Sequence, residues 1–425
     1  MKVLVIGTGG REHALARALS TDPAVTALYC APGNPGIAEL AELRPVDAQD
    51  PAAVRDLAVA LGVDLVVVGP EAPLVAGVAD PVREAGIAVF GPSKAAALLE
   101  GSKAFAKEIM AAAGIPTAKA YVCESEAEYV KALDEFAARG EGAIGHSPYV
   151  VKDDALAAGK GVVVTEDRAA ALEHARACGR VVIEEYLDGP EVSLFGVTDG
   201  TTVIPMMPSQ DFKRIGDGDA GPNTGGMGAY CPLPWAPEGL TDEVVETVLQ
   251  PLVDELRRRG TPFAGLVYAG LALTSKGLRV VEFNARFGDP ETQSVLAMLE
   301  SPLSELLYPA ATGTLAEAPG PRWRDGASVT VVMAAAGYPG TPRGGDVITG
   351  IEAAEQPGTV VNQAGTKRSA DGDLVTAGGR VLAVTAVADG LGAARAKAYE
   401  GVAVIGFDGE QHRTDIAAEA AKTAG

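Results

Sequence analysis

The sequence predicts an α/β protein whose first part is built around a parallel sheet. Between residues 1 and 90, strand-like runs alternate with helix-like runs, and the strand-like runs are almost wholly apolar. Strands that alternate with helices and are apolar on both faces are typical of a parallel sheet covered by helices on both sides. Strands are predicted at 3–6, 27–30, 65–68 and 88–90, and helices at 11–19, 52–61 and 78–85.

The middle of the chain predicts further sheet elements, including a small separate lobe. A largely helical stretch at 93–113 ends at Gly114 and Pro116. Strand-like runs at 149–152 and 161–164 then flank a glycine-bearing loop, which predicts a hairpin. The other predicted elements are a helix at 166–178, strands at 181–184, 192–197 and 202–206, a helix at 241–259, and a hairpin of 265–274 with 277–283.

Two later segments lack a regular pattern. Residues 209–230 are rich in glycine and show little periodicity, which predicts a long functional loop. Residues 316–326 are polar, contain proline and glycine, and predict a linker. Because strands at 328–334, 359–361 and 380–387 and a helix at 391–399 follow, we expect a separate C-terminal domain.

Composition excludes several classes of protein. The 425 residues are enough for two to four domains, and 47% of them are hydrophobic. A net charge of −21 disfavours nucleic acid as a partner. The four cysteines show no metal spacing, no apolar run reaches the roughly 18 residues of a membrane span, and the N-terminus does not read as a signal peptide. We therefore expect a soluble cytoplasmic protein with no membrane partner.

A glycine motif, Gly7-Thr-Gly-Gly-Arg-Glu-His13, follows the first strand and opens a helix. A dinucleotide site needs a third glycine, where this chain has Glu12, and an acidic residue after the second strand, where it has Cys30-Ala-Pro-Gly33. An NAD site is therefore disfavoured. Two interpretations stay open: a helix N-terminus that binds a phosphate, and a plain strand–helix turn.

The strongest chemical motif lies at the end of the 277–283 strand. Because side chains alternate along a strand, Glu282, Asn284 and Arg286 share one face. Carboxylate and amide oxygens suit Mg²⁺, which also keeps waters and substrate phosphates as ligands. The guanidinium beside them can bind a carboxylate or a phosphate.

Two weaker motifs precede it. Lys152 ends a strand just before a glycine-bearing loop, so it predicts a phosphate contact, although a plain hairpin explains it equally well. Glu184-Glu-Tyr-Leu187 follows a strand whose end could present backbone groups to an adenine, and Glu191 could accept from a ribose. Acidic residues near a turn are more often merely solvated.

Together these motifs resemble those of the ATP-grasp ligases, and more closely those of the phosphoribosylamine–glycine ligases. The match runs along nearly the whole chain, and its most specific parts are 222–230 and the stretch ending Asp289-Pro-Glu-Thr-Gln293. The resemblance implies an N-terminal doubly wound domain (1–100), an ATP-grasp core (101–122 and 188–318), a small mobile lobe (123–187) and a C-terminal α+β domain (327–425).

The resemblance also implies ATP, Mg²⁺ (or Mn²⁺), glycine and 5-phosphoribosylamine as ligands of a monomer. Glycine would be ligated to phosphoribosylamine through glycyl phosphate, in purine biosynthesis. The implied nucleotide contacts are Lys103, Lys152, Gly159, Lys160, Gly161, Glu184, Glu185, Tyr186, Leu187 and Glu191. The implied metal ligands are Glu282 and Asn284, the catalytic residues Arg286, Asp211 and Lys213, and the substrate residues Gly9, Gly10, Arg11, Glu71, Asn223, Thr224, Gly225 and Gly226.

The chain departs from the family's pattern in a few places, which leaves the closing of the small lobe open. Asp153 and Ala155 stand where the family usually has alanine and glycine, residues 173–181 are too short for a loop that the family usually carries, and 139–147 reads as an insertion. Three other functions are weighed against the ligase: an ATP-grasp carboxylase that uses bicarbonate, a nucleotide-binding oxidoreductase, and a catalytically inactive binding protein.

Overall fold

The N-terminal part of the computed structural model is a parallel five-stranded sheet, in the order β3-β2-β1-β4-β5. The structure describes residues 1–139, 148–156 and 161–423. The sheet's strands are β1 (Lys2–Gly7), β2 (Ala27–Pro32), β3 (Glu42–Leu43), β4 (Leu65–Val68) and β5 (Ala88–Phe90). Its connecting helices are α1 (Gly10–Ser20), α2 (Pro51–Leu61), α3 (Glu71–Ala76) and α4 (Ala79–Glu84). The predicted parallel sheet is confirmed.

Alternate residues of β1 pack on opposite sides of this sheet. Leu4 and Ile6 join the hydrophobic cluster under α2 and α4, whereas Val3 and Val5 join the one that contains α1 and α12 (Ser304–Thr312). Both faces of the strand are therefore buried, and this explains why its sequence is apolar throughout rather than alternating.

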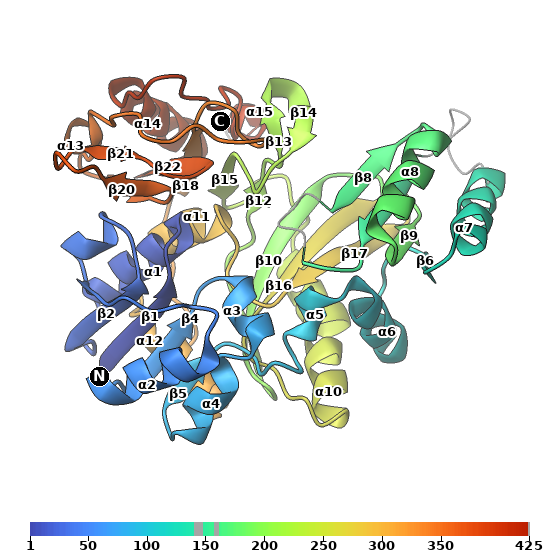
Figure 1. Cartoon of the computed structure of the whole chain (residues 1–425), viewed down its shortest axis with the longest axis horizontal. Coiled ribbons are helices and arrows are strands. Elements are labelled where there is room, and N and C mark those ends of the chain that lie inside the picture. Colours follow the sequence, from blue (N-terminus) through green and yellow to red (C-terminus); the bar gives the residue numbers. More distant parts are fainter. Residues whose placement is uncertain (140–147, 157–160, 424–425) are drawn as a thin grey trace.

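Two antiparallel sheets follow, and Figure 1 shows the smaller one projecting away from the rest of the molecule. The central sheet has the order β11-β10-β16-β17, and the small sheet has the order β6-β9-β7-β8. The central strands are β10 (Glu191–Asp199), β11 (Val203–Pro205), β16 (Ala264–Thr274) and β17 (Gly277–Asn284). The small sheet consists of β6 (Ala120–Cys123), β7 (Tyr149–Asp153), β8 (Val162–Thr165) and β9 (Val181–Glu184), with helices α7 (Glu126–Arg139) and α8 (Arg168–Cys178). The predicted hairpin corresponds to β7 and β8, which pair directly.

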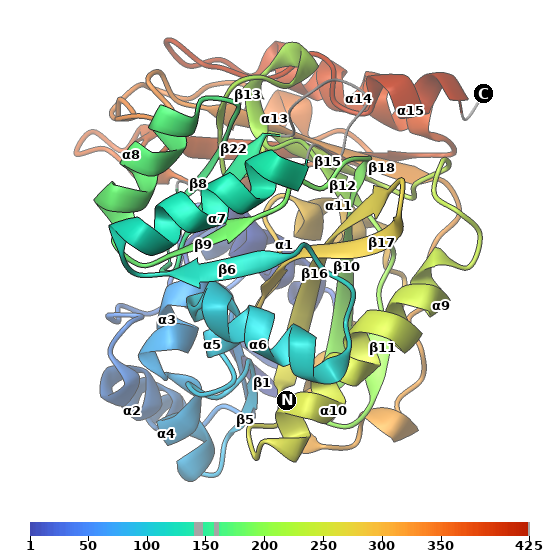
Figure 2. The same ribbon diagram turned by 90° about the vertical axis from the view of Figure 1, so that its right-hand side faces the viewer.

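The two long predicted helices are interrupted. The stretch 93–113 contains α5 (Leu98–Gly101) and α6 (Lys103–Ala113), which break at Ser102 because its hydroxyl accepts from the Phe105 N–H and caps α6. The stretch 241–259 contains α9 (Leu240–Val244), a π-helical turn (Val245–Leu249) and α10 (Gln250–Arg258). The π-turn comes just before Pro251, whose missing N–H disturbs the regular hydrogen bonding. In Figure 2, α6 and α10 lie together beneath the central sheet.

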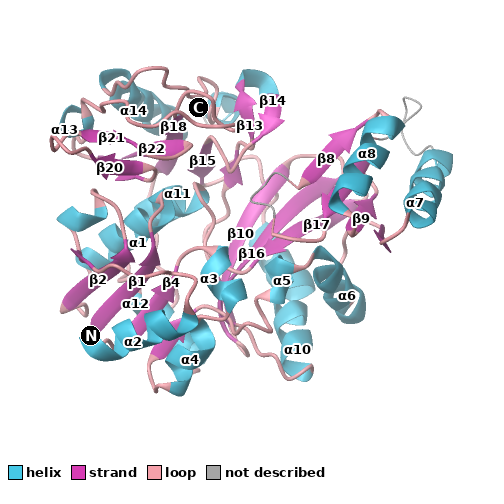
Figure 3. Ribbon diagram, viewed as in Figure 1, coloured by secondary structure: helices cyan, strands magenta, loops and turns pink. Residues whose placement is uncertain are grey.

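The C-terminal sheet draws strands from two parts of the chain, in the order β12-β15-β18-β22-β19. Strands β18 (Ala327–Ala334), β19 (Thr359–Gln363) and β22 (Arg380–Ala388) are confirmed, and α14 (Leu391–Val404) packs on β18 and β22. The other elements here are α11 (Glu291–Met298), α13 (Ile351–Ala354), β20 (Thr366–Arg368), β21 (Leu374–Thr376) and α15 (Ala418–Thr423). Figure 3 shows the mixture of helix and strand in this α+β part.

The prediction of one long loop at 209–230 was wrong. This stretch forms β12 (Gln210–Asp211), β13 (Arg214–Gly216), β14 (Ala220–Asn223) and β15 (Gly228–Cys231). Strands of two to four residues are too short to show an alternating pattern. Strand β15 pairs with β18, so the loops of this stretch are held between the central and the C-terminal sheets.

A buried histidine joins the N-terminal sheet to the C-terminal one. His13 on α1 is 2% exposed, and its Nδ1 accepts from the Gln363 N–H on β19 at 2.8 Å. Asn34 donates to the Gln363 carbonyl at 2.8 Å. Burial, together with the nearby charge of Arg17, lowers the pKa of His13 to about 3. The ring is therefore neutral in the folded protein at ordinary pH.

This histidine should make stability depend on pH. Once unfolded, His13 binds a proton below about pH 6.5, whereas the folded protein resists protonation down to about pH 3, so stability is lost as the pH falls between those values. Between pH 7 and pH 5 the loss is about 2 kcal/mol. In denaturant unfolding, the free energy of unfolding of a His13→Gln variant should depend less on pH over this range than that of the wild type. The His174→Gln variant should show the same pH dependence as the wild type. Equal slopes in wild type and His13→Gln would contradict the assignment.

Candidate active site

A cleft of about 840 Å³ lies between the small sheet and the central sheet, and residues of the N-terminal and C-terminal parts close one end of it. It brings together most of the residues singled out from the sequence. Those that line it are Arg11, Glu71, Lys103, Lys152, Gly161, Glu184, Glu185, Tyr186, Leu187, Glu191, Asp211, Lys213, Asn223, Thr224, Gly225, Glu282, Asn284 and Arg286. Gly9, Gly10 and Gly226 do not line it, and Gly159, Lys160 and most of 139–147 lie outside the described residues.

Strand β17 presents Glu282 and Asn284 to the cleft, with Arg286 just beyond its end. A bulge lies between β16 and β17, because Gly270 pairs with Glu282 while Leu271 pairs with Val280. Val281 is thus the extra residue, and the alternation from Glu282 onward is kept. In the described part of the chain, the Glu282 carboxylate makes no hydrogen bond or ion pair. Burial alone would raise its pKa, but the charges of Lys213, Lys152, Lys103 and Arg286 lower it.

The Arg286 guanidinium is held by two carboxylates. Its Nε donates to Glu71 at 3.1 Å, and its Nη2 lies 3.0 Å from Glu100, which also accepts from the Ala285 N–H at 2.8 Å. Burial would lower the pKa of Arg286, but Glu100 and Glu71 raise it above its usual value. Arg11 lies 4.0 Å from the same Glu71 oxygen. Two guanidinium groups therefore flank one carboxylate at this end of the cleft.

The small sheet contributes an ion pair and a free backbone edge. Glu184, expected at an adenine, is 3% exposed and holds Lys152 and Lys107, each at 3.0 Å. After it, the Glu185 N–H donates to the Lys119 carbonyl at 3.0 Å. Within the described residues the Leu187 N–H has no hydrogen-bond partner, so it can bind a ligand's acceptor.

The loops around β12 place Asp211 and Lys213 opposite β17. Burial raises the pKa of Asp211 to about 7. The positive charge of Lys213 opposes this shift, and the negative charges of Glu291, Glu191 and Glu282 add to it. Lys213 donates to Glu191, so the residue expected at a ribose is already paired with a lysine. The cleft thus holds a carboxyl group that can exchange a proton near neutral pH.

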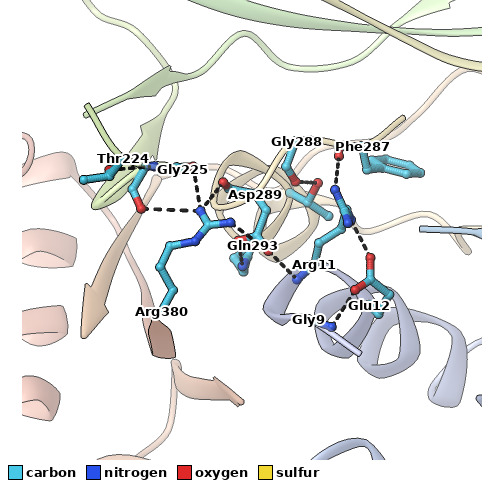
Figure 4. A network of polar contacts seen from close by, with 12 residues as sticks. Gly9, Arg11, Glu12, Thr224, Gly225, Phe287, Gly288, Asp289, Gln293 and Arg380 are labelled. Atoms are coloured by element: carbon cyan, nitrogen blue, oxygen red, sulfur yellow. Dashed lines mark hydrogen bonds and ion pairs between the residues drawn. The ribbon is translucent and has the colours of Figure 1, made fainter. Parts of the chain in front are cut away.

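Arg380, from the C-terminal sheet, also lines the cleft, and Figure 4 shows it beside Gly225 and Asp289. Its Nη1 donates to the carbonyl oxygens of Gly225 at 2.6 Å and Asp289 at 2.5 Å. Asp289 accepts from the Arg11 N–H at 3.3 Å and from Gln293 at 2.8 Å. These contacts tie the glycine-rich loop before β15 to the N-terminus of α1.

The first turn of α1 is occupied by protein carboxylates. The Gly9 N–H donates to the Glu12 carboxylate at 2.6 Å. Glu12 stands at the position where a dinucleotide motif has its third glycine. A Cβ on Gly69 would lie 2.1 Å from a Glu12 oxygen, so the ends of β1 and β4 close around this side chain. The arrangement agrees with the expectation that the motif is not a dinucleotide site.

Hydrogen bonds of Arg413 connect the C-terminal end of the chain to the hairpin of β13 and β14. Arg413, which is 1% exposed, donates to Asp219 and to both oxygens of Asp415, each at 2.7 Å. Its guanidinium also lies 4.9 Å from the centre of the Phe212 ring. Arg413 therefore holds Asp219, which lines the cleft, in place.

Sequence reasoning missed several residues of this cleft, among them Glu100, Lys107, Glu291 and Arg380. Lys107 had a usable signal, because it lies four residues after Lys103 and so shares its helix face. Glu291 stands in the quoted motif; its side chain accepts from the Tyr268 hydroxyl at 2.5 Å. For Arg380 we find no local signal.

The cleft fits a divalent metal that is completed by other ligands. Glu282 and Asn284 supply hard oxygen donors, and the Glu282 carboxylate has no hydrogen bond or ion pair with any residue that the structure describes. Among the described residues, no three His, Cys, Asp or Glu side chains form a metal cluster. Mg²⁺ often takes only one or two protein ligands beside phosphates and water, so this set is sufficient.

Comparisons with known proteins agree with this geometry. Three family models of phosphoribosylglycinamide synthetase match the chain: the N domain at 1–100, the ATP-grasp (A) domain at 101–292 and the C domain at 328–419. The phosphoribosylamine–glycine ligase of Streptomyces coelicolor is 66% identical over 99% of this chain and 100% of its own. The chain belongs to the phosphoribosylamine–glycine ligase family. Members of this family are ATP-dependent ligases that use a divalent metal ion.

Solved structures show the same fold. The phosphoribosylamine–glycine ligase of Thermotoga maritima matches with a TM-score of 0.83 and 31% identity, over 98% of this chain and 100% of that one. The biotin carboxylase domain of the Hydrogenobacter thermophilus 2-oxoglutarate carboxylase matches with a TM-score of 0.72 and 17% identity, over 97% and 91% of the two chains. The second likeness shows the ATP-grasp fold alone. In the described part of the chain, no helix is long and apolar enough to span a membrane.

Proposed function

We propose that this enzyme ligates glycine to 5-phosphoribosylamine, with conversion of ATP to ADP and phosphate, and thereby forms glycinamide ribonucleotide in purine biosynthesis. The observation that carries the proposal is the full-length match to the phosphoribosylamine–glycine ligases. The cleft supports it, because one cavity is lined by cationic side chains, by the Glu282 carboxylate, which no other described residue engages, and by the Asp211 carboxyl group with a pKa of about 7.

The nucleotide is proposed to lie between the small sheet and β17. Lys103 and Lys152 would contact the phosphates, together with the backbone of Gly161 and, outside the described residues, Gly159 and Lys160. The backbone of Glu185, Tyr186 and Leu187 would hold the adenine, and the support for this is the Leu187 N–H, which has no acceptor among the described residues. Glu191, which also accepts a hydrogen bond from Lys213, would accept from the ribose hydroxyls.

Glu282 and Asn284 are proposed to hold Mg²⁺ (or Mn²⁺). When bound, the metal would neutralise phosphate charge during transfer. The protein's own groups do the rest of the positioning. Lys152 and Lys103 neutralise the phosphates, and Arg286, which Glu71 and Glu100 hold rigidly, faces the reacting end of the nucleotide.

The proposed reaction has two steps. A carboxylate oxygen of glycine attacks the γ-phosphorus of ATP, the bond to ADP breaks, and glycyl phosphate forms. The amine of phosphoribosylamine then attacks the carbonyl carbon, phosphate leaves, and the nitrogen loses a proton. Asp211, whose pKa is near 7, is our candidate for accepting that proton, and Lys213 for stabilising the departing phosphate.

The substrate side is proposed to lie at the end of the cleft near α1. Residues Arg11, Glu71, Asn223, Thr224 and Gly225 all line the cleft, and Gly226 follows in the same loop without lining it. Gly9 and Gly10 belong to the same turn but do not line the cleft, so their contribution would be to shape the backbone beneath Arg11. One chain supplies every residue of this set, which supports a monomer, and four free thiols support a reducing compartment such as the cytoplasm.

The experiment that tests the proposal measures ADP release with freshly prepared phosphoribosylamine. Glycine should be required, and bicarbonate should not replace it. If bicarbonate supports ADP release and glycine does not, the carboxylase alternative is correct instead.

A further inference from the structure

Three lysines, Lys103, Lys107 and Lys152, line the nucleotide side of the cleft, but their ammonium groups are used differently. A lysine ammonium has three N–H donors and no acceptor, so the donors that the protein already engages can be counted. Among the described residues, Lys103 donates to one protein oxygen, the Ala155 carbonyl at 3.2 Å. Because Lys103 lines the cleft, its remaining donors can bind a ligand there.

In the described part of the chain, the Lys152 ammonium has two protein partners. Its Nζ is ion-paired with Glu184 Oε2 at 3.0 Å and donates to the Val281 carbonyl at 3.0 Å, beside the bulge in β17. Counted over these residues, one donor is left for a phosphate. The direction of that donor is determined by the positions of the two oxygens that take the others.

Lys107 uses all three of its donors within the protein. Its Nζ lies 3.0 Å from Glu184 Oε1, 2.9 Å from the Thr117 hydroxyl and 3.1 Å from the Ala118 carbonyl. Although the residue lines the cleft, its ammonium has no donor left for a ligand. Its charge is directed at Glu184 rather than at the nucleotide.

The Glu184 carboxylate lies between the two lysines and is 3% exposed. Each of its oxygens contacts one ammonium, Oε1 that of Lys107 and Oε2 that of Lys152. Leaving an oxygen of a buried carboxylate without a partner costs free energy, which favours a rearrangement that restores the contact. If Lys107 were removed, Glu184 would rotate or draw Lys152 toward itself, and the free donor of Lys152 would lose its direction.

The same contacts join parts of the fold that carry the nucleotide. Lys107 is on α6, Glu184 and Lys152 are on the small sheet, and the Thr117 hydroxyl donates to the Val280 carbonyl of β17 at 2.6 Å. The group therefore sits where the small sheet meets the central one. Its geometry affects how the small sheet sits above the phosphates.

We infer that Lys107 is a positioning residue of the ATP site, which acts through Glu184 to orient the free N–H of Lys152 toward the nucleotide phosphates. The inference rests on the proposed function in one respect, namely that ATP is bound in this cleft. It assigns no contact between Lys107 and any substrate. Its consequences therefore appear in nucleotide binding and should be absent from the affinity for glycine.

The test is a double-mutant cycle on ATP affinity, measured by calorimetry with the full-length protein, ATP and Mg²⁺. Lys107→Met should weaken ATP binding by about 10-fold, the size expected for the loss of one charge-assisted hydrogen bond. In a Glu184→Gln background, the same substitution should change the affinity by less than about twofold, because the route through Glu184 is already lost. The KM for glycine should stay within about twofold of the wild type in Lys107→Met.

Lys131→Met is the matched control, because Lys131 is an exposed lysine on α7 and its removal makes the same change in charge. It should bind ATP as the wild type does. Circular dichroism establishes that each variant is folded, and Lys107→Gln, judged by the same criteria, replaces Lys107→Met if the latter does not fold.

Two results would overturn the inference. One is an unchanged ATP affinity in Lys107→Met. The other is an equal loss in the wild-type and Glu184→Gln backgrounds, because that would mean a direct contact between Lys107 and the nucleotide. A wild-type protein that binds ATP but shows no glycine-dependent ADP release would refute the proposed function instead, and the cycle would still decide the role of Lys107.

Discussion

Replacing Glu282 with alanine should reduce glycine-dependent ADP formation by a factor on the order of 10²–10³ or more, without unfolding the protein. Glu282 makes no hydrogen bond or ion pair within the described residues, so its removal breaks no polar contact among them. Its carboxylate is the charged member of the proposed metal site, and Asn284 alone is a neutral and weak ligand. The loss should therefore fall on metal-dependent turnover.

The measurement is steady-state ADP release over a titration of Mg²⁺, with circular dichroism to establish folding. Glu246→Ala is the control, because Glu246 is an exposed glutamate on the π-helical turn before α10. It should retain the activity of the wild type. If Glu282→Ala kept full activity at low Mg²⁺, the metal assignment would be wrong.

The second large effect is expected for Lys152→Ala. This substitution removes the ammonium that contacts both Glu184 and the Val281 carbonyl, and of the two lysines that the described residues place at the buried Glu184 carboxylate only Lys107 is then left. ATP affinity should fall by about 10–100-fold, as expected for the loss of a hydrogen bond between a charged donor and a phosphate. Calorimetric titration with ATP measures the change.

Lys131→Ala, which removes an exposed lysine from the same part of the chain, should leave that affinity unaltered. An unchanged affinity in Lys152→Ala would show that the triphosphate lies elsewhere. The comparison with Lys107→Met is also informative. Because Lys107 is inferred to act through Lys152, its removal should weaken ATP binding no more than the removal of Lys152 itself.

The parallel sheet could be predicted from the sequence because its central strands β1 and β4 are buried on both faces. An apolar run that ends at a glycine or proline, such as the one before Gly7 or Gly69, is a strong local signal. The stretch 209–230 offered no such signal, since its strands have two to four residues. Their pairing with the C-terminal sheet is a tertiary effect that no local pattern contains.

The face shared by Glu282, Asn284 and Arg286 was predictable for a reason that the structure makes clear. The bulge in β17 lies at Val281, before the first of these residues. A bulge two residues later would have moved Glu282 to the opposite face from Arg286, and the argument from alternation would have failed. The sequence alone does not distinguish these two cases.

The residues that hold the site together were harder to predict than those that line it. Arg380 reaches Gly225 and Asp289 from a strand that lies far away in the sequence. Glu184 was placed at the adenine because of its position after a strand, whereas its side chain forms a buried ion pair with two lysines. Partners that meet only through the tertiary fold leave no local trace in the sequence.

The central claim is that a triphosphate lies between the small sheet and β17. The side chains of Glu282, Asn284 and Arg286 face this triphosphate. A crystal structure with Mg²⁺ and a non-hydrolysable ATP analogue tests this most directly. The account predicts a metal ion on Glu282 and Asn284, phosphates within hydrogen-bond distance of Lys152, and an adenine at the Leu187 N–H. A nucleotide bound outside this cleft, or a metal ion held by other residues, would contradict it.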